Sequence, residues 1–90
     1  MKSVHVFISG RVQGVFFRSN TVKKAQSLGL KGFIRNLEDG RVEVVFEGDE
    51  AAIKKMLEFC KRGQIPAKVT NVKIKEEKYK GEFKDFEVRY

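Results

Sequence analysis

The sequence contains very little cysteine, histidine or proline, and no tryptophan. Its 90 residues include a single cysteine, Cys60, so an internal disulfide is impossible and a zinc site built from cysteines is excluded. The only histidine is His5, which further disfavours a transition-metal site, and we expect no metal and no cofactor. Because one proline argues against long linkers and the chain is short, we expect a single domain over residues 1–90.

Long apolar stretches are missing as well. The N-terminal sequence MKSVHVFISG holds only a short apolar run, and no stretch reaches the roughly 18 apolar residues of a transmembrane helix. The sequence therefore predicts neither a signal peptide nor a membrane segment, and we expect a cytoplasmic protein. A hydrophobic content of 41% with eight phenylalanines favours a packed core over a disordered chain.

Acidic residues are absent before Glu38, although the chain as a whole carries 19 basic and 12 acidic side chains. The net charge of +7 favours anionic partners, which include nucleic acids, acidic surfaces and phosphorylated small molecules. Many lysines are interleaved with acids, and the simplest interpretation of each is a solvated surface residue. The charge therefore narrows the ligand class to anions without choosing among them.

Alternation of apolar and polar side chains predicts a strand over residues 41–47. The turn signal Glu38-Asp39-Gly40 before it predicts a hairpin with an earlier strand. One face of the strand carries Val42, Val44 and Phe46, and the other carries Arg41, Glu43 and Glu47.

Helical spacing of apolar residues predicts two helices. The second begins after Asp49, which can cap it, and ends at Gly63. Its core-facing stripe is Ile53, Met56, Leu57 and Cys60, and we expect Cys60 to be a small core residue rather than a nucleophile. The other expected elements are a strand at 3–10, a loop at 11–17, a helix at about 18–28, a strand at 30–37, a strand at 69–78, a turn at Lys80-Gly81 and a strand at 83–90 with Phe86, Val88 and Tyr90 on one side.

This order, β-α-β-β-α-β followed by one more strand, predicts a ferredoxin-like α+β sandwich. Two helices would cover one face of an antiparallel sheet, with the extra C-terminal strand as a hairpin arm. Because a helix connects the strands at 3–10 and 30–37, they should be parallel, with a right-handed crossover. Their carboxyl ends then lie at the same end of the sheet, which brings the loop at 10–17 close to Asn36.

The segment from Gly10 to Arg18 leads into the start of a helix. Helix N-termini present unpaired N–H groups and the positive end of the helix dipole. A glycine in the loop, such as Gly14, can aim further N–H groups at one anion. The glycine pattern alone is neither a dinucleotide-binding nor a P-loop signature, and by itself it suits an ordinary strand-to-helix turn.

Arg18 strengthens the anion hypothesis. A cation at a helix start opposes the helix dipole, and Arg11 adds a second cation with no acid nearby in the sequence. A bound anion would neutralise both, and a planar guanidinium matches two phosphate oxygens at once. The alternative is that Arg18 pairs with a distant acid, for example the C-terminal carboxylate of Tyr90.

Two segments of the sequence resemble the signatures of the acylphosphatase family. The first matches at every defined position and reads Ile8-Ser9-Gly10-Arg11-Val12-Gln13-Gly14-Val15-Phe16-Phe17-Arg18. The second reads Gly32-Phe33-Ile34-Arg35-Asn36, followed by Gly40, Val42 and Gly48 at the expected spacing. Ile34 stands where the family usually has Val, Ala or Cys. The resemblance extends over essentially the whole chain.

The resemblance implies an enzyme that hydrolyses a small acyl phosphate to a carboxylate and inorganic phosphate. Arg18 would bind the phosphoryl oxygens, and Asn36 would orient the attacking water. We expect a monomer with no membrane partner and no specific nucleic acid. The phosphate-binding loop, which would act through its backbone N–H groups, consists of Gln13, Gly14, Val15, Phe16, Phe17 and Arg18.

The residues present suit this chemistry. Phosphoryl transfer needs mainly positioning and charge stabilisation, and a carboxylate leaving group, with a conjugate acid of pKa about 4, departs at neutral pH without a general acid. His5 lies well before the loop on its strand and is expected to be structural. Glu38 and Asp39 would be repelled by a phosphate dianion and are expected to be turn residues.

Two other interpretations stay open. A basic ferredoxin-like module that binds nucleic acid without catalysis is the main alternative, because RRM domains share this element order. The RRM aromatic signature is missing from residues 41–47, and we expect the aromatics Phe7, Phe17, Phe33, Phe46 and Phe86 to lie in the core. The other is an accessory acylphosphatase-like domain of a larger carbamoyl-transfer protein, which the 90-residue length disfavours.

Overall fold

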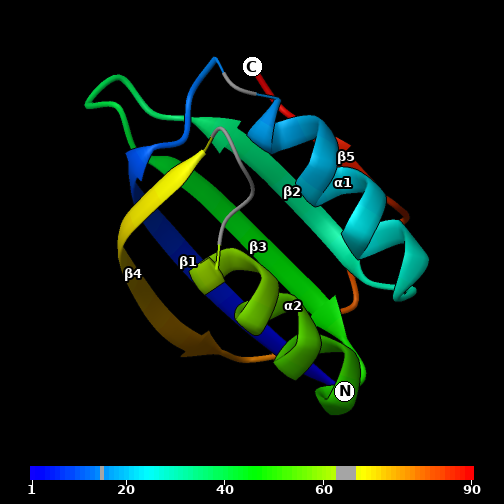
Figure 1. Cartoon of the computed structure of the whole chain (residues 1–90). Helices are drawn as coiled ribbons and strands as arrows, with labels where there is room; N and C mark the ends of the chain where they lie inside the picture. Colours follow the sequence, from blue (N-terminus) through cyan, green and yellow to red (C-terminus); the bar gives the residue numbers. More distant parts are fainter. Residues whose placement is uncertain (15, 63–66) are drawn as a thin grey trace.

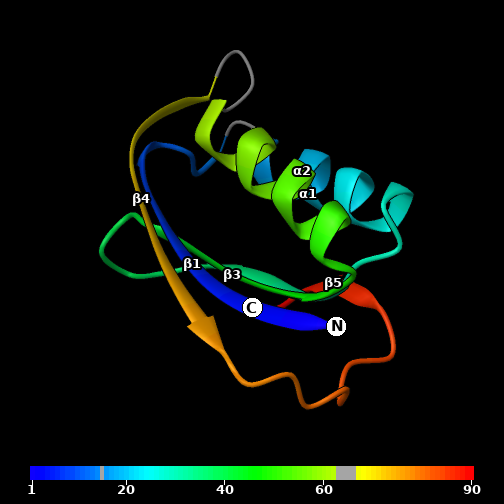
Figure 2. The same cartoon turned by 90° about the horizontal axis from the view of Figure 1, so that it is seen from below.

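Five strands form one sheet, and two helices cover one of its faces (Figure 1, Figure 2). The computed structural model describes residues 1–14, 16–62 and 67–90. The elements, in chain order, are β1 (Lys2–Arg11), α1 (Phe17–Ser27), β2 (Lys31–Asn36), β3 (Val42–Gly48), α2 (Glu50–Arg62), β4 (Lys68–Glu77) and β5 (Phe86–Val88). The predicted ferredoxin-like α+β fold is confirmed, and both helices lie on the same face, as Figure 2 shows.

The strands are ordered β4-β1-β3-β2-β5 across the sheet. The β1–β3, β1–β4 and β2–β3 pairs are antiparallel, so β1 and β2 are parallel to each other, as predicted. The predicted turn at residues 38–40 is also present, because Leu37 donates its N–H to the carbonyl of Arg41 at 2.8 Å.

The final strand differs from the prediction in its partner and its length. Strand β5 pairs in parallel with β2, so the sheet is mixed rather than antiparallel, and no hairpin joins β4 to β5. Residues 78–85, which we call the strap, instead cross the face away from the helices to reach the opposite edge (Figure 2). The buried Glu47 carboxylate accepts the N–H groups of Lys80 and Gly81, at 3.4 and 3.2 Å, and so holds the strap.

The core lies between the helices and the sheet. Val42, Val44 and Phe46 of β3 are fully buried there, as the alternation predicted, and Phe46 stacks on Phe86 with ring centroids 5.5 Å apart. From α2, the buried residues are Ile53, Met56 and Cys60. Burial raises the pKa of the Cys60 thiol to about 12, which leaves it a core residue rather than a nucleophile.

The other sheet face, which we call the open face, holds two side chains that the sequence placed in the core. Phe7 and Phe33 are only partly buried, so that prediction is wrong for these two. The Arg41 guanidinium lies 5.0 Å from the ring centroid of Phe7, and that of Arg89 lies 4.2 Å from that of Phe33. Arginines therefore cover both rings, which leaves them poorly placed to stack on nucleic-acid bases.

A charged cluster also lies on the open face. Glu43 is buried, accepts a hydrogen bond from Arg35 and lies 2.6 Å from His5 Nε2. The second ring nitrogen of His5 lies 2.9 Å from Glu77 of β4. His5 thus joins β1 to both of its neighbours, which agrees with the structural role predicted for it.

The Glu43 cluster makes stability depend on acid pH. Burial alone would raise the pKa of Glu43, but hydrogen bonds from Arg35 and His5 outweigh it and hold the pKa below its ordinary value. The stabilisation is therefore complete above the ordinary glutamate pKa of about 4.3 and is lost as the pH falls through the lower folded value. Urea unfolding between about pH 5 and pH 3 should show a weaker loss of stability in Glu43→Gln than in the wild type. The exposed Glu58→Gln serves as control, and equal slopes for all three proteins would contradict the expectation.

Candidate active site

The carboxyl ends of β1 and β2 meet at one end of the sheet. Ile8 of β1 and Asn36 of β2 both pair with Val42 of β3, from opposite sides. Neighbouring strands lie about 4.8 Å apart, so Ile8 and Asn36 are level with each other across roughly 10 Å. Strand β1 continues for three residues beyond this level, to Arg11, and the loop that follows lies at the same end of the sheet as the end of β2, as the topology predicted.

Gly10 directs the chain into this loop. The pairing of β1 with β4 shifts register between Ser9 and Gly10, and Gly10 has a φ of 128°. A Cβ atom at this position would lie 2.1 Å from the carbonyl oxygen of Lys68, so only glycine fits.

Helix α1 starts without a side-chain cap. Its N-cap residue is Phe16, in the left-handed conformation, and no side chain bonds the free N–H groups of the first turn. The first turn also contains no acidic residue, so nothing there neutralises the positive end of the helix dipole. This helix start therefore has the backbone donors and the field of an anion site.

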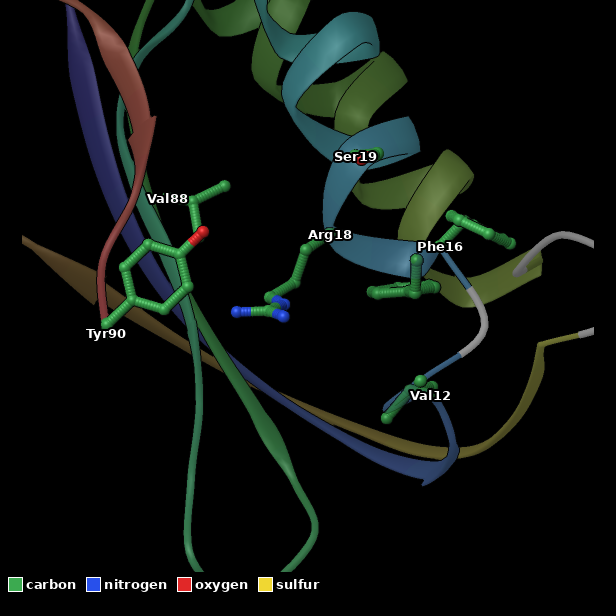
Figure 3. Close-up of a pocket in the computed structure, with 8 residues that line it drawn as sticks. Val12, Phe16, Arg18, Ser19, Val88 and Tyr90 are labelled. Carbon is green, nitrogen blue, oxygen red and sulfur yellow. The ribbon is translucent and has the colours of Figure 1, made fainter.

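A pocket of about 270 Å³ opens at this helix start (Figure 3). The Arg18 side chain extends into it, and its guanidinium carbon lies 5.4 Å from the centroid of the Tyr90 ring. Within the described part of the chain, no carboxylate forms an ion pair with Arg18; the alternative pairing with the Tyr90 carboxylate is therefore not found, and the ring takes its place. The pocket is lined by Val12, Gly14, Phe16, Phe17, Arg18, Ser19, Val88 and Tyr90.

Gln13 lies outside the lining of the pocket and connects its loop to the β2–β3 turn. Its side-chain amide donates to the carbonyl oxygens of Leu37 and Arg41, each at 2.9 Å. These bonds hold the loop against the residues that directly follow Asn36. Val15, the remaining loop residue of the predicted site, lies outside the described residues.

Asn36 is the last residue of β2 and carries a buried polar atom without a partner. Its Oδ1 is buried and has no hydrogen-bond partner in the described structure. Such an atom costs about 1–3 kcal/mol when left unpaired, so a retained one calls for an explanation. Asn36 does not line the Arg18 pocket; what connects them is the Gln13 contact and the shared end of the sheet.

The far wall of the pocket was not predicted from the sequence, which suggested only the Tyr90 carboxylate as an alternative partner of Arg18. Val88 and Tyr90 reach it because β5 pairs with β2, a pairing that the hairpin prediction did not contain. Ser19 and the side chain of Phe16 also line the pocket, although the sequence suggested only a backbone role for Phe16. No local signal could have identified Val88 or Tyr90, since their placement depends on the edge that β5 joins.

Replacing Gln13 tests whether the loop needs this anchor. Gln13→Ala removes two hydrogen bonds, so we expect the free energy of unfolding to fall by about 1–2 kcal/mol. Misplacement of the loop should also lower kcat/KM for acyl phosphates by about tenfold. The control is Gln26→Ala, which removes a similar bond, to the carbonyl of Phe86, away from the pocket. A loss of stability without loss of activity in Gln13→Ala would contradict the positioning role.

The fold and the pocket describe a small ferredoxin-like protein with an arginine-centred anion site at a helix start. The acylphosphatase family model matches residues 4–88. An acylphosphatase of Syntrophobacter fumaroxidans is 48% identical over 89 residues, covering 99% of this chain and 92% of that protein. The acylphosphatase structure from Bacillus subtilis superposes with a TM-score of 0.95 at 34% identity, covering both chains completely. The chain belongs to the acylphosphatase family, whose members are enzymes that hydrolyse acyl phosphates.

The comparisons also bear on the alternative interpretations. A structure of full-length HypF contains the same fold at 25% identity and a TM-score of 0.87, but the match covers only 12% of that chain. The Syntrophobacter relative, by contrast, is matched over nearly its whole length, which favours the enzyme over the accessory-domain interpretation. Nothing in these comparisons favours a nucleic-acid-binding module. None of the helices in the described residues has the length and apolar character needed to cross a membrane.

Proposed function

We propose that this protein hydrolyses the carboxyl-phosphate bond of small acyl phosphates, with Arg18 and the loop backbone holding the phosphoryl group. The observation that carries the proposal is the position of Arg18: a half-buried cation in a pocket at an uncapped helix start, without a carboxylate partner in the described structure. A phosphoryl dianion supplies the missing charge, and the guanidinium binds two of its oxygens. The N–H groups of Gln13, Gly14, Phe16 and Phe17 would complete the cradle.

We assign Asn36 the task of orienting the attacking water. An amide oxygen accepts a hydrogen bond but is too weak a base to remove a proton, so Asn36 acts by alignment. The Oδ1 atom is buried and has no hydrogen-bond partner in the described structure, so the protein itself does not use its capacity to accept a bond. The water oxygen bonds to phosphorus while the bond from phosphorus to the acyl oxygen breaks, and the electron pair leaves with the carboxylate. The proton lost by the water goes to a phosphoryl oxygen, so the immediate products are a carboxylate and dihydrogen phosphate, which can then release a further proton to solvent.

The reaction should not require a metal ion, because a carboxylate of pKa about 4 is a good leaving group and Arg18 provides the positive charge. The test is hydrolysis of acetyl phosphate in the presence of a chelator, followed by the release of inorganic phosphate. Turnover at the same rate with and without chelator is the expected result. Loss of turnover that returns with added divalent cation would contradict the mechanism.

Titration with inorganic phosphate, the product, tests where the anion binds. Amide shifts in a ¹H–¹⁵N spectrum should be largest for Gly14, Phe16, Phe17 and Arg18. Shifts spread over the lysines of α2 and β4 instead would point to nonspecific attraction by the net charge of +7.

We also propose that the protein acts as a monomer in the cytoplasm. The support for a monomer is that residues of α1, of β5 and of the loop between β1 and α1 suffice to line the Arg18 pocket, so the proposed site does not need a second subunit. Sedimentation at working concentration should give the mass of a single 10.4 kDa chain. Activity that rises with oligomer content would overturn this part of the proposal.

A further inference from the structure

Two strongly exposed aromatic side chains lie at the same pocket. Within the described residues, Phe16 is 78% exposed and Tyr90 is fully exposed, whereas Tyr79, the next aromatic in this ranking, is 41% exposed. Both line the Arg18 pocket, and Figure 3 shows them on opposite sides of the arginine. Large exposed apolar groups that gather at one site mark a surface that another molecule covers.

The backbone conformation of Phe16 is also unfavourable in free energy. Phe16 is the only residue other than glycine with a positive φ, 61°, among the described residues. Glycine or asparagine adopts this left-handed conformation much more readily than a bulky aromatic residue. The strain and the exposure of the ring are not offset by packing in the core. The fold alone therefore does not explain a phenylalanine at this position, whereas contact with a ligand does.

The size of the pocket indicates which part of a ligand would contact Phe16 and Tyr90. A phosphoryl group has the bulk of only a few water molecules, at about 30 Å³ each, and the pocket holds about 270 Å³. Apart from Arg18 and Ser19, the side chains around it are apolar or aromatic, and Val12 and Val88 extend the surface formed by the two rings. The space beyond the phosphate site therefore suits an apolar group.

We infer that Phe16 and Tyr90 form an acyl subsite, which selects acyl phosphates with an apolar, preferably aromatic, acyl group. The inference rests on the proposed function. Arg18 holds the phosphoryl group, and the acyl group extends from it between the rings of Phe16 and Tyr90. Phe16 is the specificity-determining residue, because its ring is 78% exposed at the pocket and its backbone has the left-handed conformation.

The test compares an aromatic and a small aliphatic substrate. The kcat/KM for benzoyl phosphate is divided by that for acetyl phosphate, so any loss common to both, such as a disturbed loop, cancels in the ratio. Phe16→Gly fits the left-handed backbone and removes the ring, and should lower this ratio by about tenfold. Phe16→Leu keeps an apolar side chain and should keep the ratio within about threefold of wild type. An unchanged ratio in Phe16→Gly would overturn the inference.

A measurement on the wild type covers the case in which the variants fold poorly. Benzylphosphonate should inhibit more strongly than methylphosphonate, by about tenfold, because only the first fills the acyl subsite. Equal inhibition by the two phosphonates would overturn the acyl subsite while leaving the proposed function intact. Failure of the wild type to hydrolyse either acyl phosphate would instead overturn the proposed function.

Discussion

Arg18→Ala should lower kcat/KM for acyl phosphates by about a thousandfold and weaken inhibition by inorganic phosphate. The guanidinium is the one side-chain cation lining the described pocket, so its loss removes charge stabilisation from both the bound substrate and the transition state. Steady-state kinetics should therefore show a higher KM and a lower kcat together. Arg18→Lys keeps the charge but loses bidentate hydrogen bonding to the phosphate, and its kcat/KM should lie between those of the alanine variant and the wild type.

The matched control for Arg18 is Lys23→Ala. Lys23 is an exposed cation on the same helix, and its removal changes the net charge equally. We expect activity within about twofold of the wild type, since exposed charges away from the site are screened by salt. If Arg18→Ala hydrolysed acyl phosphates like the wild type, or if both variants lost activity equally, the proposed role of Arg18 would be wrong.

Asn36→Ala should lower kcat by about a hundredfold and leave KM nearly unchanged. Orientation of the water affects the chemical step, whereas the phosphate contacts that set KM come from Arg18 and the loop. The variant should fold as well as the wild type, because the substitution removes a buried oxygen that has no partner. If Asn36 had a purely structural role, its replacement would not lower activity while leaving stability unchanged.

Urea unfolding and phosphate inhibition separate these roles for Asn36. The inhibition constant of inorganic phosphate should match the wild type, which places the defect after binding. Asn71→Ala, at an exposed position of β4, provides the control for loss of an amide elsewhere. A loss of stability in Asn36→Ala that accounts for the loss of activity would contradict the assignment.

Most of the fold could be predicted because its signals are local. The stripe on α2 and the alternation in β3 mark the faces that meet in the core, although the charged face of β3, with Glu43 and Glu47, is buried as well. The edge that β5 joins could not be predicted, since alternation says which side of a strand is buried but not which strand is its neighbour. The carboxylate of Glu47, which holds the strap, makes contacts that are distant in the sequence, and nothing local indicates them.

The placement of the candidate site in the fold was predictable to a similar degree and for the same reason. Gly10 and Arg18 lie in one continuous segment, and the parallel arrangement of β1 and β2 brings Asn36 to the same end of the sheet. The bonds from Gln13 to the β2–β3 turn and the ring of Tyr90 over Arg18 depend on side-chain placement between distant segments. The family resemblance supplied roles for Arg18 and Asn36, but it said nothing about the aromatic walls of the pocket.

The position of β1 in the sheet has a consequence for how the chain folds. The first strand pairs with β3 and β4, both far along the sequence, and with no neighbouring segment. Closing such long loops costs entropy before any contact forms, so a topology of this kind folds in milliseconds to seconds rather than microseconds. The loop that leads to Arg18 continues directly from β1, and its bulge at Gly10 requires β4 to be in place. Phosphate binding should therefore emerge only in the last stage of refolding, when the whole sheet has formed.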